Sequence, residues 1–222
     1  MSEAAAPFES AALREVTGPC LRPGGTALTD RALSFCDFPA GARLLDVGCG
    51  MGGTVAHLRS SHGFAAFGID PSRRLVAAGK ARPPSLPLSA GVAEALPVAG
   101  GALDGILCEC VLSVVADPRR ALAEFHRALR PGGLLILSDL YRKGAAAPPS
   151  GEEPRGPIPR AALGRLLDEC GFAVSLWEDH TPLLRELAAR LLLAHGRLEP
   201  GWCGCDPGER PGYFLLVAAK ED

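Results

Sequence analysis

The stretch Leu44-Leu45-Asp46-Val47-Gly48-Cys49-Gly50-Met51-Gly52-Gly53 joins a short apolar run to an acid and a glycine-rich turn. Residues 43–47 have the length and composition of a buried parallel strand, and residues 54–60 are typical of a helix. Because glycine has no Cβ, the backbone at Gly48 and Gly50 can adopt positive φ and lie against a ligand, beside the unpaired N–H groups of the helix start. The stretch therefore predicts a site for a nucleotide-type cofactor.

The glycine spacing alone leaves the cofactor open, because Gly48, Gly50 and Gly53 also match the G-x-G-x-x-G pattern of dinucleotide-binding proteins. Asp46 stands two residues before Gly48, where a carboxylate attracts an ammonium group and repels a pyrophosphate. The next apolar run ends in Asp70, at the distance where an acid accepts hydrogen bonds from ribose hydroxyls. Asp70 suits either cofactor, whereas Asp46 disfavours a dinucleotide such as NAD.

Apolar runs alternate with helical patterns along most of the chain. The runs that are typical of strands are residues 43–47, 64–69, 86–91, 103–109, 133–140, 172–177 and 213–219. The helical patterns include residues 118–128, a helix that begins at Arg160, and residues 183–194. This alternation predicts an α/β fold with a parallel, doubly wound sheet.

The length of 222 residues and the 47% hydrophobic content are sufficient for one domain over residues 1–222. We expect residues 1–40 to form a cap over the cofactor cleft and residues 41–142 to form the cofactor-binding core. Residues 143–159 are rich in Pro, Gly and Ala and predict a loop or lid. Residues 160–222 then complete the sheet.

Four motifs occur in an order and spacing that match a known family: Leu45-Asp46-Val47-Gly48-Cys49-Gly50, Gly68-Ile69-Asp70-Pro71-Ser72, Ala93-Glu94-Ala95-Leu96-Pro97 and Leu129-Arg130-Pro131-Gly132-Gly133. Over residues 44–141 the chain resembles the class I S-adenosylmethionine-dependent methyltransferases, in the branch of the ubiquinone/menaquinone C-methyltransferases and arsenite methyltransferases. The resemblance implies a Rossmann-like, mostly parallel seven-stranded sheet whose last strand is antiparallel. It also implies S-adenosyl-L-methionine as the cofactor.

The resemblance also implies positions for the parts of the cofactor. Around the methionine portion would lie Asp46, Gly48, Gly50 and Met51. Asp70 would bind the ribose, and Ala93 and Glu94 would lie near adenine. Where the family often has an acid for the adenine amino group, this chain has Val92, so adenine would rely on backbone contacts near Ala93. The predicted cofactor-binding residues are Asp46, Gly48, Cys49, Gly50, Met51, Asp70, Pro71, Ala93, Glu94 and Cys108.

Methyl transfer needs a base only when the acceptor must lose a proton, so candidate catalytic groups are acids, His or Tyr at strand ends. Glu109 ends the fourth strand, and a capping or solvated acid is the alternative. Asp139 and Tyr141 end the fifth strand, where surface polarity is the alternative. Glu178, Asp179 and His180 precede the helix start Thr181-Pro182, so helix capping is preferred there, with His180 kept as a candidate base.

The cysteines suggest a second possible function, the methylation of a metalloid. Cys110 follows the fourth strand where the arsenite methyltransferases that the chain resembles carry a thiol, and Cys20 lies upstream in the predicted cap. Cys203 and Cys205 could add thiolates for trivalent arsenic or a related metalloid. The alternative is that these residues pack as small apolar side chains. The one-residue gap of Cys203-Gly204-Cys205 is tighter than zinc sites use, so we expect no structural metal.

A formal net charge of −2 disfavours a nucleic-acid substrate. No apolar run is long enough to cross a bilayer and no secretory signal is evident, so we expect a cytoplasmic protein, without membrane insertion, whose eight cysteines are reduced. The expected function is methyl transfer to a small-molecule acceptor by a monomer or homodimer. Thiolate-assisted metalloid methylation, an NAD-dependent oxidoreductase and a non-catalytic cofactor-binding protein are the alternatives.

Overall fold

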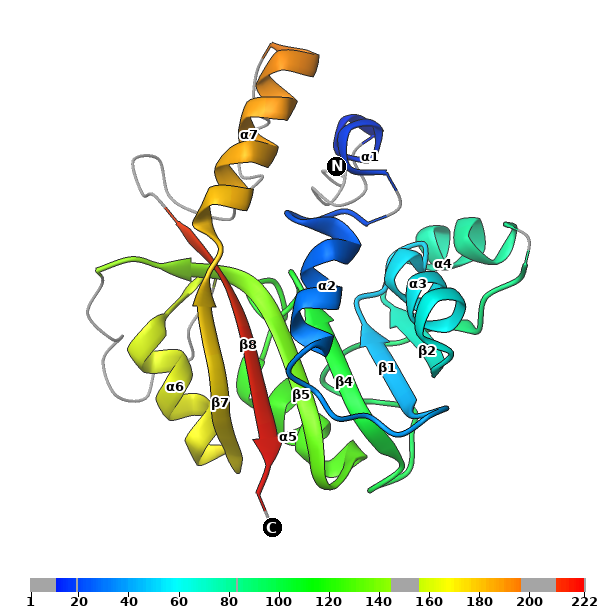
Figure 1. Ribbon diagram of the computed structural model, residues 1–222, viewed down its shortest axis with the longest axis vertical. Coiled ribbons are helices and arrows are strands. Elements are labelled where there is room, and N and C mark those ends of the chain that lie inside the picture. Colours follow the sequence, from blue (N-terminus) through cyan, green and yellow to red (C-terminus); the bar gives the residue numbers. More distant parts are fainter. Residues whose placement is uncertain (1–10, 19, 83, 145–155, 197–210, 222) are drawn as a thin grey trace.

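The computed structural model describes residues 11–18, 20–82, 84–144, 156–196 and 211–221. One twisted sheet crosses the described part of the molecule (Figure 1), with its strands in the order β3-β2-β1-β4-β5-β8-β7. The strands are β1 (Arg43–Val47), β2 (Ala65–Asp70), β3 (Leu88–Ala90), β4 (Leu103–Glu109), β5 (Leu129–Arg142), β6 (Ile158–Pro159), β7 (Phe172–Asp179) and β8 (Gly212–Lys220).

The pairing confirms the predicted fold class. Strands β3, β2, β1, β4 and β5 are parallel neighbours, and β8 is antiparallel to both β5 and β7. The structure adds one short element, because β6 pairs with the end of β5 and makes the sheet eight-stranded. β6 lies inside the predicted loop of residues 143–159, where Pro and Gly hide a two-residue pairing from sequence analysis.

Helices cover both faces of the sheet (Figure 1). They are α1 (Ala11–Thr17), α2 (Gly25–Leu33), α3 (Gly53–His62), α4 (Arg73–Lys80), α5 (Pro118–Ala128), α6 (Arg160–Glu169) and α7 (Thr181–His195). Helix α5 has the predicted bounds, with Asp117 as its N-cap accepting a hydrogen bond from the N–H of Arg120. Within the described residues, no helix combines the length and apolarity that a bilayer crossing requires.

Alternation along the central strands divides the apolar core between the two faces. Leu45 packs in one buried cluster with the α5 residue Phe125, whereas its neighbour Leu44 packs in another with the α3 residue Leu58. Successive side chains of a strand point to opposite faces, so helices on both sides bury β1 completely after its first residue. This explains why the strand reads as a continuous apolar run.

The order of the strands creates the place for a site. β1 has β2 as one neighbour and β4 as the other, and all three strands run parallel. The connections from β1 and β4 therefore leave toward opposite sides at the carboxyl end of the sheet, which opens a crevice at this point. The predicted cap contributes α1 and α2, and α2 packs against α3.

Two glycines in helices test how tightly the loop after β1 is packed. A Cβ on Gly79 of α4 would lie 2.5 Å from the backbone oxygen of Met51, whereas a Cβ on Gly164 of α6 would have no heavy atom within 4 Å. Gly79→Ala should therefore destabilise the protein by about 1–3 kcal/mol despite the better helix propensity of alanine. Gly164→Ala should stabilise it by about 0.5–1 kcal/mol. Urea denaturation measures both, and equal effects of the two substitutions would contradict the packing described here.

Candidate active site

A cavity of about 320 Å³ lies where the strands β1, β2 and β4 end. Its walls come from four segments: residues 20–22 of the predicted cap, residues 46–54 around the glycine loop, residues 70–75 after β2, and residues 109–114 after β4. Of the predicted site residues, the lining contains Asp46, Gly48, Cys49, Gly50, Asp70, Pro71, Glu109 and Cys110. The lining also contains residues 20–22, which belong to the predicted cap and include Cys20.

The glycine loop has a conformation that side chains resist. Gly48, Gly50 and Gly52 have φ values of 74°, 53° and 80°, in the left-handed region. A Cβ on Gly48 would lie 2.1 Å from a methyl group of Val111. The backbone at Gly48 is therefore close to the β4 end, and the loop can border the cavity without side chains filling it.

Asp70 holds the glycine loop in place. Its Oδ2 accepts a hydrogen bond of 2.8 Å from the N–H of Gly50, and its Oδ1 accepts one of 2.8 Å from the N–H of Ser72. Ser72 in turn caps α4, its hydroxyl accepting from the N–H of Leu75. The carboxylate at the end of β2 therefore fixes the two backbone segments that flank the cavity.

A buried ion pair connects the cap to the end of β4. Arg22 and Glu109 are 6% and 8% exposed, and Nη2 of Arg22 lies 2.8 Å from Oε2 of Glu109. The Arg22 guanidinium also donates to the carbonyl oxygen of Gly25. Burial acts to lower the pKa of Arg22, but the Glu109 carboxylate outweighs it, and the pKa is raised. Arg22 therefore remains a cation in the lining of the cavity.

Two threonines complete this network. Arg22 Nη2 donates to the hydroxyl of Thr29 at 2.5 Å and to that of Thr54 at 3.3 Å. The same hydroxyls donate to Glu109, Thr29 at 3.2 Å and Thr54 at 3.0 Å. Helices α2 and α3 thus each contribute one hydroxyl to a single buried charge pair.

Asp46 is a buried acid of the cavity whose pKa is perturbed. It is 3% exposed, and burial raises its pKa well above the ordinary value. The carboxylates of Glu109 and Asp70 raise the pKa further, while Arg22 opposes them. Among the described lining residues the charged side chains are these three acids and Arg22, so the lining carries an excess of acidic groups.

Cys110 has an unusual backbone. Its φ of 59° is the only positive value of a non-glycine residue in the described part of the chain, a conformation that costs about 1–2 kcal/mol. Its N–H donates to the carbonyl oxygen of Ser138 at 2.7 Å, and its Sγ lies 3.3 Å from the hydroxyl of the buried Tyr213. Burial, aided by the carboxylate of Asp139, raises the pKa of the thiol, which is therefore protonated at neutral pH.

Other predicted cofactor-binding residues lie outside the cavity lining. Cys108 is fully buried in the sheet, and Ala93 is buried in the same core cluster. Met51 is buried within the glycine loop. Glu94 accepts a hydrogen bond of 3.0 Å from the N–H of Ala116, in the connection that leads to α5. Contacts of these residues with a cofactor stay predictions.

The remaining candidate bases make structural contacts outside the lining. Asp139 accepts hydrogen bonds from the N–H and the hydroxyl of Ser113, at 2.9 and 2.7 Å. Tyr141 donates to Asp179 at 3.0 Å, and Asp179 accepts from the N–H of Thr181 at the start of α7, which is the predicted capping role. His180 lies 2.9 Å from Glu178. Catalytic roles for Asp139, Tyr141 and His180 stay predictions.

Sequence reasoning missed Arg22, Thr29, Thr54 and Tyr213. Arg22 lies in a Pro- and Gly-rich segment with no motif, and it meets Glu109 only in the folded chain. Thr54 follows the glycine loop directly, which is the one local signal that pointed to it. Tyr213 sits in an apolar strand, where its hydroxyl has no sequence signature.

The ion pair predicts a non-additive effect on stability. Arg22→Met leaves the Glu109 carboxylate buried without its cation, which should cost about 3–5 kcal/mol in the free energy of unfolding. Adding Glu109→Leu removes the uncompensated charge and should restore most of this loss. Chemical denaturation of both single variants and the double variant measures the coupling, and strictly additive effects would contradict it.

The buried Asp139 predicts that the difference in stability between the wild type and Asp139→Asn depends on pH. Burial raises its pKa to about 6 from the ordinary 3.8, against hydrogen bonds from Ser113 that lower it. The folded state therefore binds more protons than the unfolded state between these values, and this group's contribution to stability falls as the pH rises through that window. At a pH above both pKa values, the ionised Asp139 destabilises the folded state by about 3 kcal/mol, because a pKa difference of one between the two states corresponds to about 1.4 kcal/mol. The stability of Asp139→Asn relative to the wild type should rise by this amount from about pH 4 to about pH 7, and a flat difference would contradict it.

Comparison with known proteins supplies the family. Residues 45–137 match the family model described as Methyltransferase domain. The demethylmenaquinone methyltransferase of Renibacterium salmoninarum is 33% identical over 139 residues, which is 62% of this chain and 58% of that protein. An uncharacterized methyltransferase of Synechocystis sp. is 30% identical over 145 residues, 60% of this chain and 68% of the relative.

A solved structure extends the similarity to almost the whole chain. The cyclase SpnF superposes with a TM-score of 0.75 and 25% identity, covering 97% of this chain and 94% of that one. In sequence, the chain spans 36%, 58% and 55% of the length of the first three relatives that it matches. With the domain match over residues 45–137 and 68% of the Synechocystis methyltransferase covered at 30% identity, the chain belongs to the class I S-adenosylmethionine-dependent methyltransferase family.

Proposed function

We propose that the chain binds S-adenosylmethionine in the cavity and transfers its methyl group to a small-molecule acceptor. The charge of the lining carries this proposal, since Asp46, Asp70 and Glu109 face a single cation, Arg22. S-adenosylmethionine brings a positive sulfonium and a positive ammonium group. An acid-rich lining attracts these groups, whereas it repels the pyrophosphate of NAD.

The residues present fit the parts of this cofactor. Both Asp70 oxygens face the cavity edge as hydrogen-bond acceptors, since each accepts a backbone N–H there, and this carboxylate would accept a ribose hydroxyl as well. Asp46 is the acid nearest in sequence to the glycine loop and would pair with the ammonium group, while Arg22 supplies the cation for the cofactor carboxylate. The left-handed loop at Gly48 and Gly50 leaves its backbone open to close approach. The bound cofactor supplies an already activated methyl group.

Apolar side chains suggest the character of the acceptor. Leu21, Val111 and Val114 line the cavity, and Val114 remains 58% exposed. Two oxygens of Glu109 already accept from Thr29 and Thr54, which leaves this acid few lone pairs for deprotonating an acceptor. Positioning is then the main contribution of the protein. We infer a small, partly apolar acceptor, and the similarity to a demethylmenaquinone methyltransferase favours quinol-like phenols.

The buried Asp46 predicts proton release on cofactor binding. Burial and the neighbouring Glu109 carboxylate raise the pKa of Asp46, and a bound ammonium group would favour its charged form and so lower that pKa. Calorimetric titration with S-adenosylmethionine in two buffers of different ionisation enthalpy should therefore show net proton release on binding. Asp46→Asn should abolish the release, while the exposed Asp37→Asn should leave it unchanged. Binding without proton release by the wild type would contradict the role of Asp46.

The proposed activity is tested in two steps. The full chain is titrated with S-adenosylmethionine, S-adenosylhomocysteine and NAD, and only the first two should bind. The loaded protein is then screened with phenols and quinols for release of S-adenosylhomocysteine. Binding of NAD alone would favour the oxidoreductase alternative. Binding of S-adenosylmethionine without product from any acceptor would favour a non-catalytic or non-methylating protein, an outcome to consider because the structurally similar SpnF is a cyclase.

A second candidate, metalloid methylation, is favoured by two thiols in one cavity. Cys20 and Cys110 both line it, whereas Cys203 and Cys205 lie outside the described residues. Burial raises the pKa of both Cys20 and Cys110, so binding of a trivalent metalloid has to displace their protons. With arsenite as the acceptor, Cys110→Ser should abolish product formation while leaving cofactor affinity unchanged. Loss of both would indicate misfolding, and loss of neither would exclude a thiol role.

A further inference from the structure

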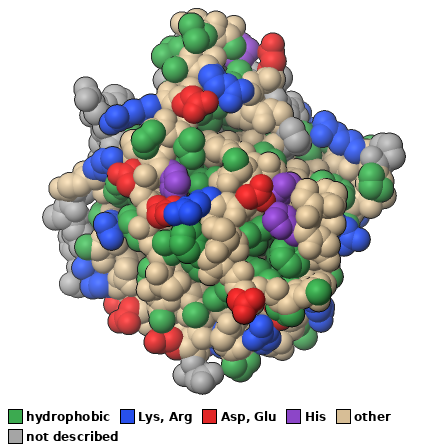
Figure 2. All heavy atoms as spheres, viewed as in Figure 1, with side chains coloured by type: hydrophobic (Ala, Val, Ile, Leu, Met, Phe, Trp, Pro, Cys, Tyr) green, Lys and Arg blue, Asp and Glu red, His purple; other side chains and the backbone are tan. Residues whose placement is uncertain are grey.

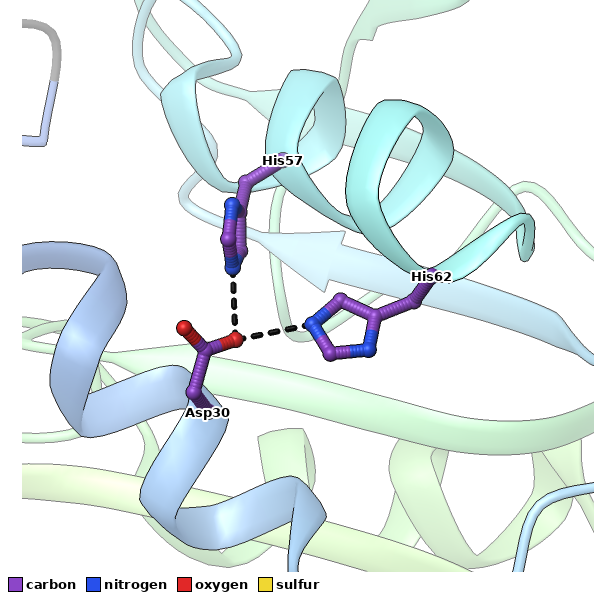
Figure 3. A group of neighbouring side chains, drawn as sticks. All are labelled: Asp30, His57 and His62. Atoms are coloured by element: carbon purple, nitrogen blue, oxygen red, sulfur yellow. Dashed lines mark hydrogen bonds and ion pairs between the residues drawn. The ribbon is translucent and has the colours of Figure 1, made fainter.

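A group of metal-ligating side chains lies outside the cavity, where α2 packs against α3. Figure 3 shows Asp30 on α2 and the rings of His57 and His62 on α3 turned toward one another. The space-filling view shows histidine beside acidic side chains on this face of the molecule (Figure 2). The cluster belongs to neither the candidate active site nor any motif in the sequence.

The three ligand atoms converge on a small volume. Oδ1 of Asp30 lies 2.6 Å from Nε2 of His57 and 2.8 Å from Nε2 of His62. The three atoms all lie within 4.8 Å of one another. Two imidazole nitrogens therefore face one carboxylate oxygen. A shared cation would bind all three atoms, just as protons on the rings would bridge them.

Neighbouring contacts hold both rings in orientation. Nδ1 of His57 lies 3.3 Å from the hydroxyl of Ser61, which leaves Nε2 to face Asp30. The His62 ring stacks on Phe64, with centroids 5.7 Å apart and planes 3° apart, and meets the His57 ring edge-on. The ligands are thus preoriented before any ion binds.

The donor set and its exposure fit a transition-metal ion. Zn²⁺ takes imidazole nitrogen and carboxylate oxygen at about 2.0–2.2 Å, so tetrahedral ligand atoms lie about 3.4 Å apart. Separations of 2.6 and 2.8 Å therefore need to widen by less than about 1 Å. The side chains of Asp30, His57 and His62 are 46%, 19% and 29% exposed, which gives them room to move and water access to a fourth position.

We propose that Asp30, His57 and His62 form a binding site for one divalent transition-metal ion, in the first place Zn²⁺, with water as the remaining ligand. Sequence patterns alone do not indicate this site, since His57 and His62 lie five positions apart in a helix and Asp30 is contributed by the predicted cap. The site is independent of the proposed methyl transfer and can be tested without any acceptor.

Its position gives the ion a structural consequence. Thr29 precedes Asp30 on α2, and Thr54 lies one turn before His57 on α3. These two threonines donate to Glu109 inside the candidate active site. A metal ion at the cluster would join the outer sides of α2 and α3, and so hold together the two helices that supply these hydroxyls.

The test is metal binding by the full chain, purified with a chelator and with its thiols kept reduced. Calorimetric titration with Zn²⁺ should give one ion per chain that depends on the cluster. His57→Gln and His62→Gln should each weaken this binding more than about tenfold. His195→Gln is the matched control, because this exposed histidine belongs to α7 and lies 3.8 Å from Glu15.

Co²⁺ provides a second readout that separates this site from the cysteines. Binding at the cluster should give a visible ligand-field spectrum without a thiolate-to-metal charge-transfer band, and His62→Gln should remove it. Zn²⁺ should also raise the melting temperature of the wild type and of His195→Gln but not of His62→Gln. Absence of Zn²⁺ binding by the wild type, equal binding by His62→Gln, or a thiolate spectrum would each overturn the proposal and leave a hydrogen-bonded Asp–His cluster.

Discussion

The buried pair of Arg22 and Glu109 is the interaction on which the candidate site depends. A charge pair with both side chains this deeply buried is costly unless every remaining donor and acceptor is satisfied. Thr29 and Thr54 meet that requirement, and they do so from two different helices. The contacts that neutralise the pair therefore also hold residue 22 and helix α2 at the cavity. The two charges of the pair act on the pKa of Asp46 in opposite directions.

The loop after β1 imposes a second constraint. Left-handed glycines let the backbone turn within a space that Val111 and Leu88 already restrict. Asp70 then ties that loop to the start of α4 through two backbone N–H groups. An acid expected to bind ribose thus also builds the wall against which a ribose would lie, so that its binding and structural contributions are coupled.

Local patterns were sufficient to predict much of the fold. Asp46 and the glycines after it lie next to one another in the chain, and the bounds of β1, β4 and α5 follow from burial and capping within one segment. What the sequence could not predict depends on contacts between distant segments. Arg22 meets Glu109, Tyr213 meets Cys110, and Asp30 meets His57 only when the chain has folded. The two-residue β6 was missed for the same reason, because its pairing partner is the end of β5.

The placement of β8 has a consequence for synthesis on the ribosome. β8 follows β7 in the chain but is inserted between β5 and β7, and it pairs with eight residues of β5 from Leu134 to Tyr141. Until residues 212–220 have left the ribosome, β5 and β7 in the nascent chain each have an edge that lacks their shared neighbour β8. Unpaired strand edges can pair with other chains. Chaperone protection of the nascent polypeptide therefore matters most before β8 has been translated.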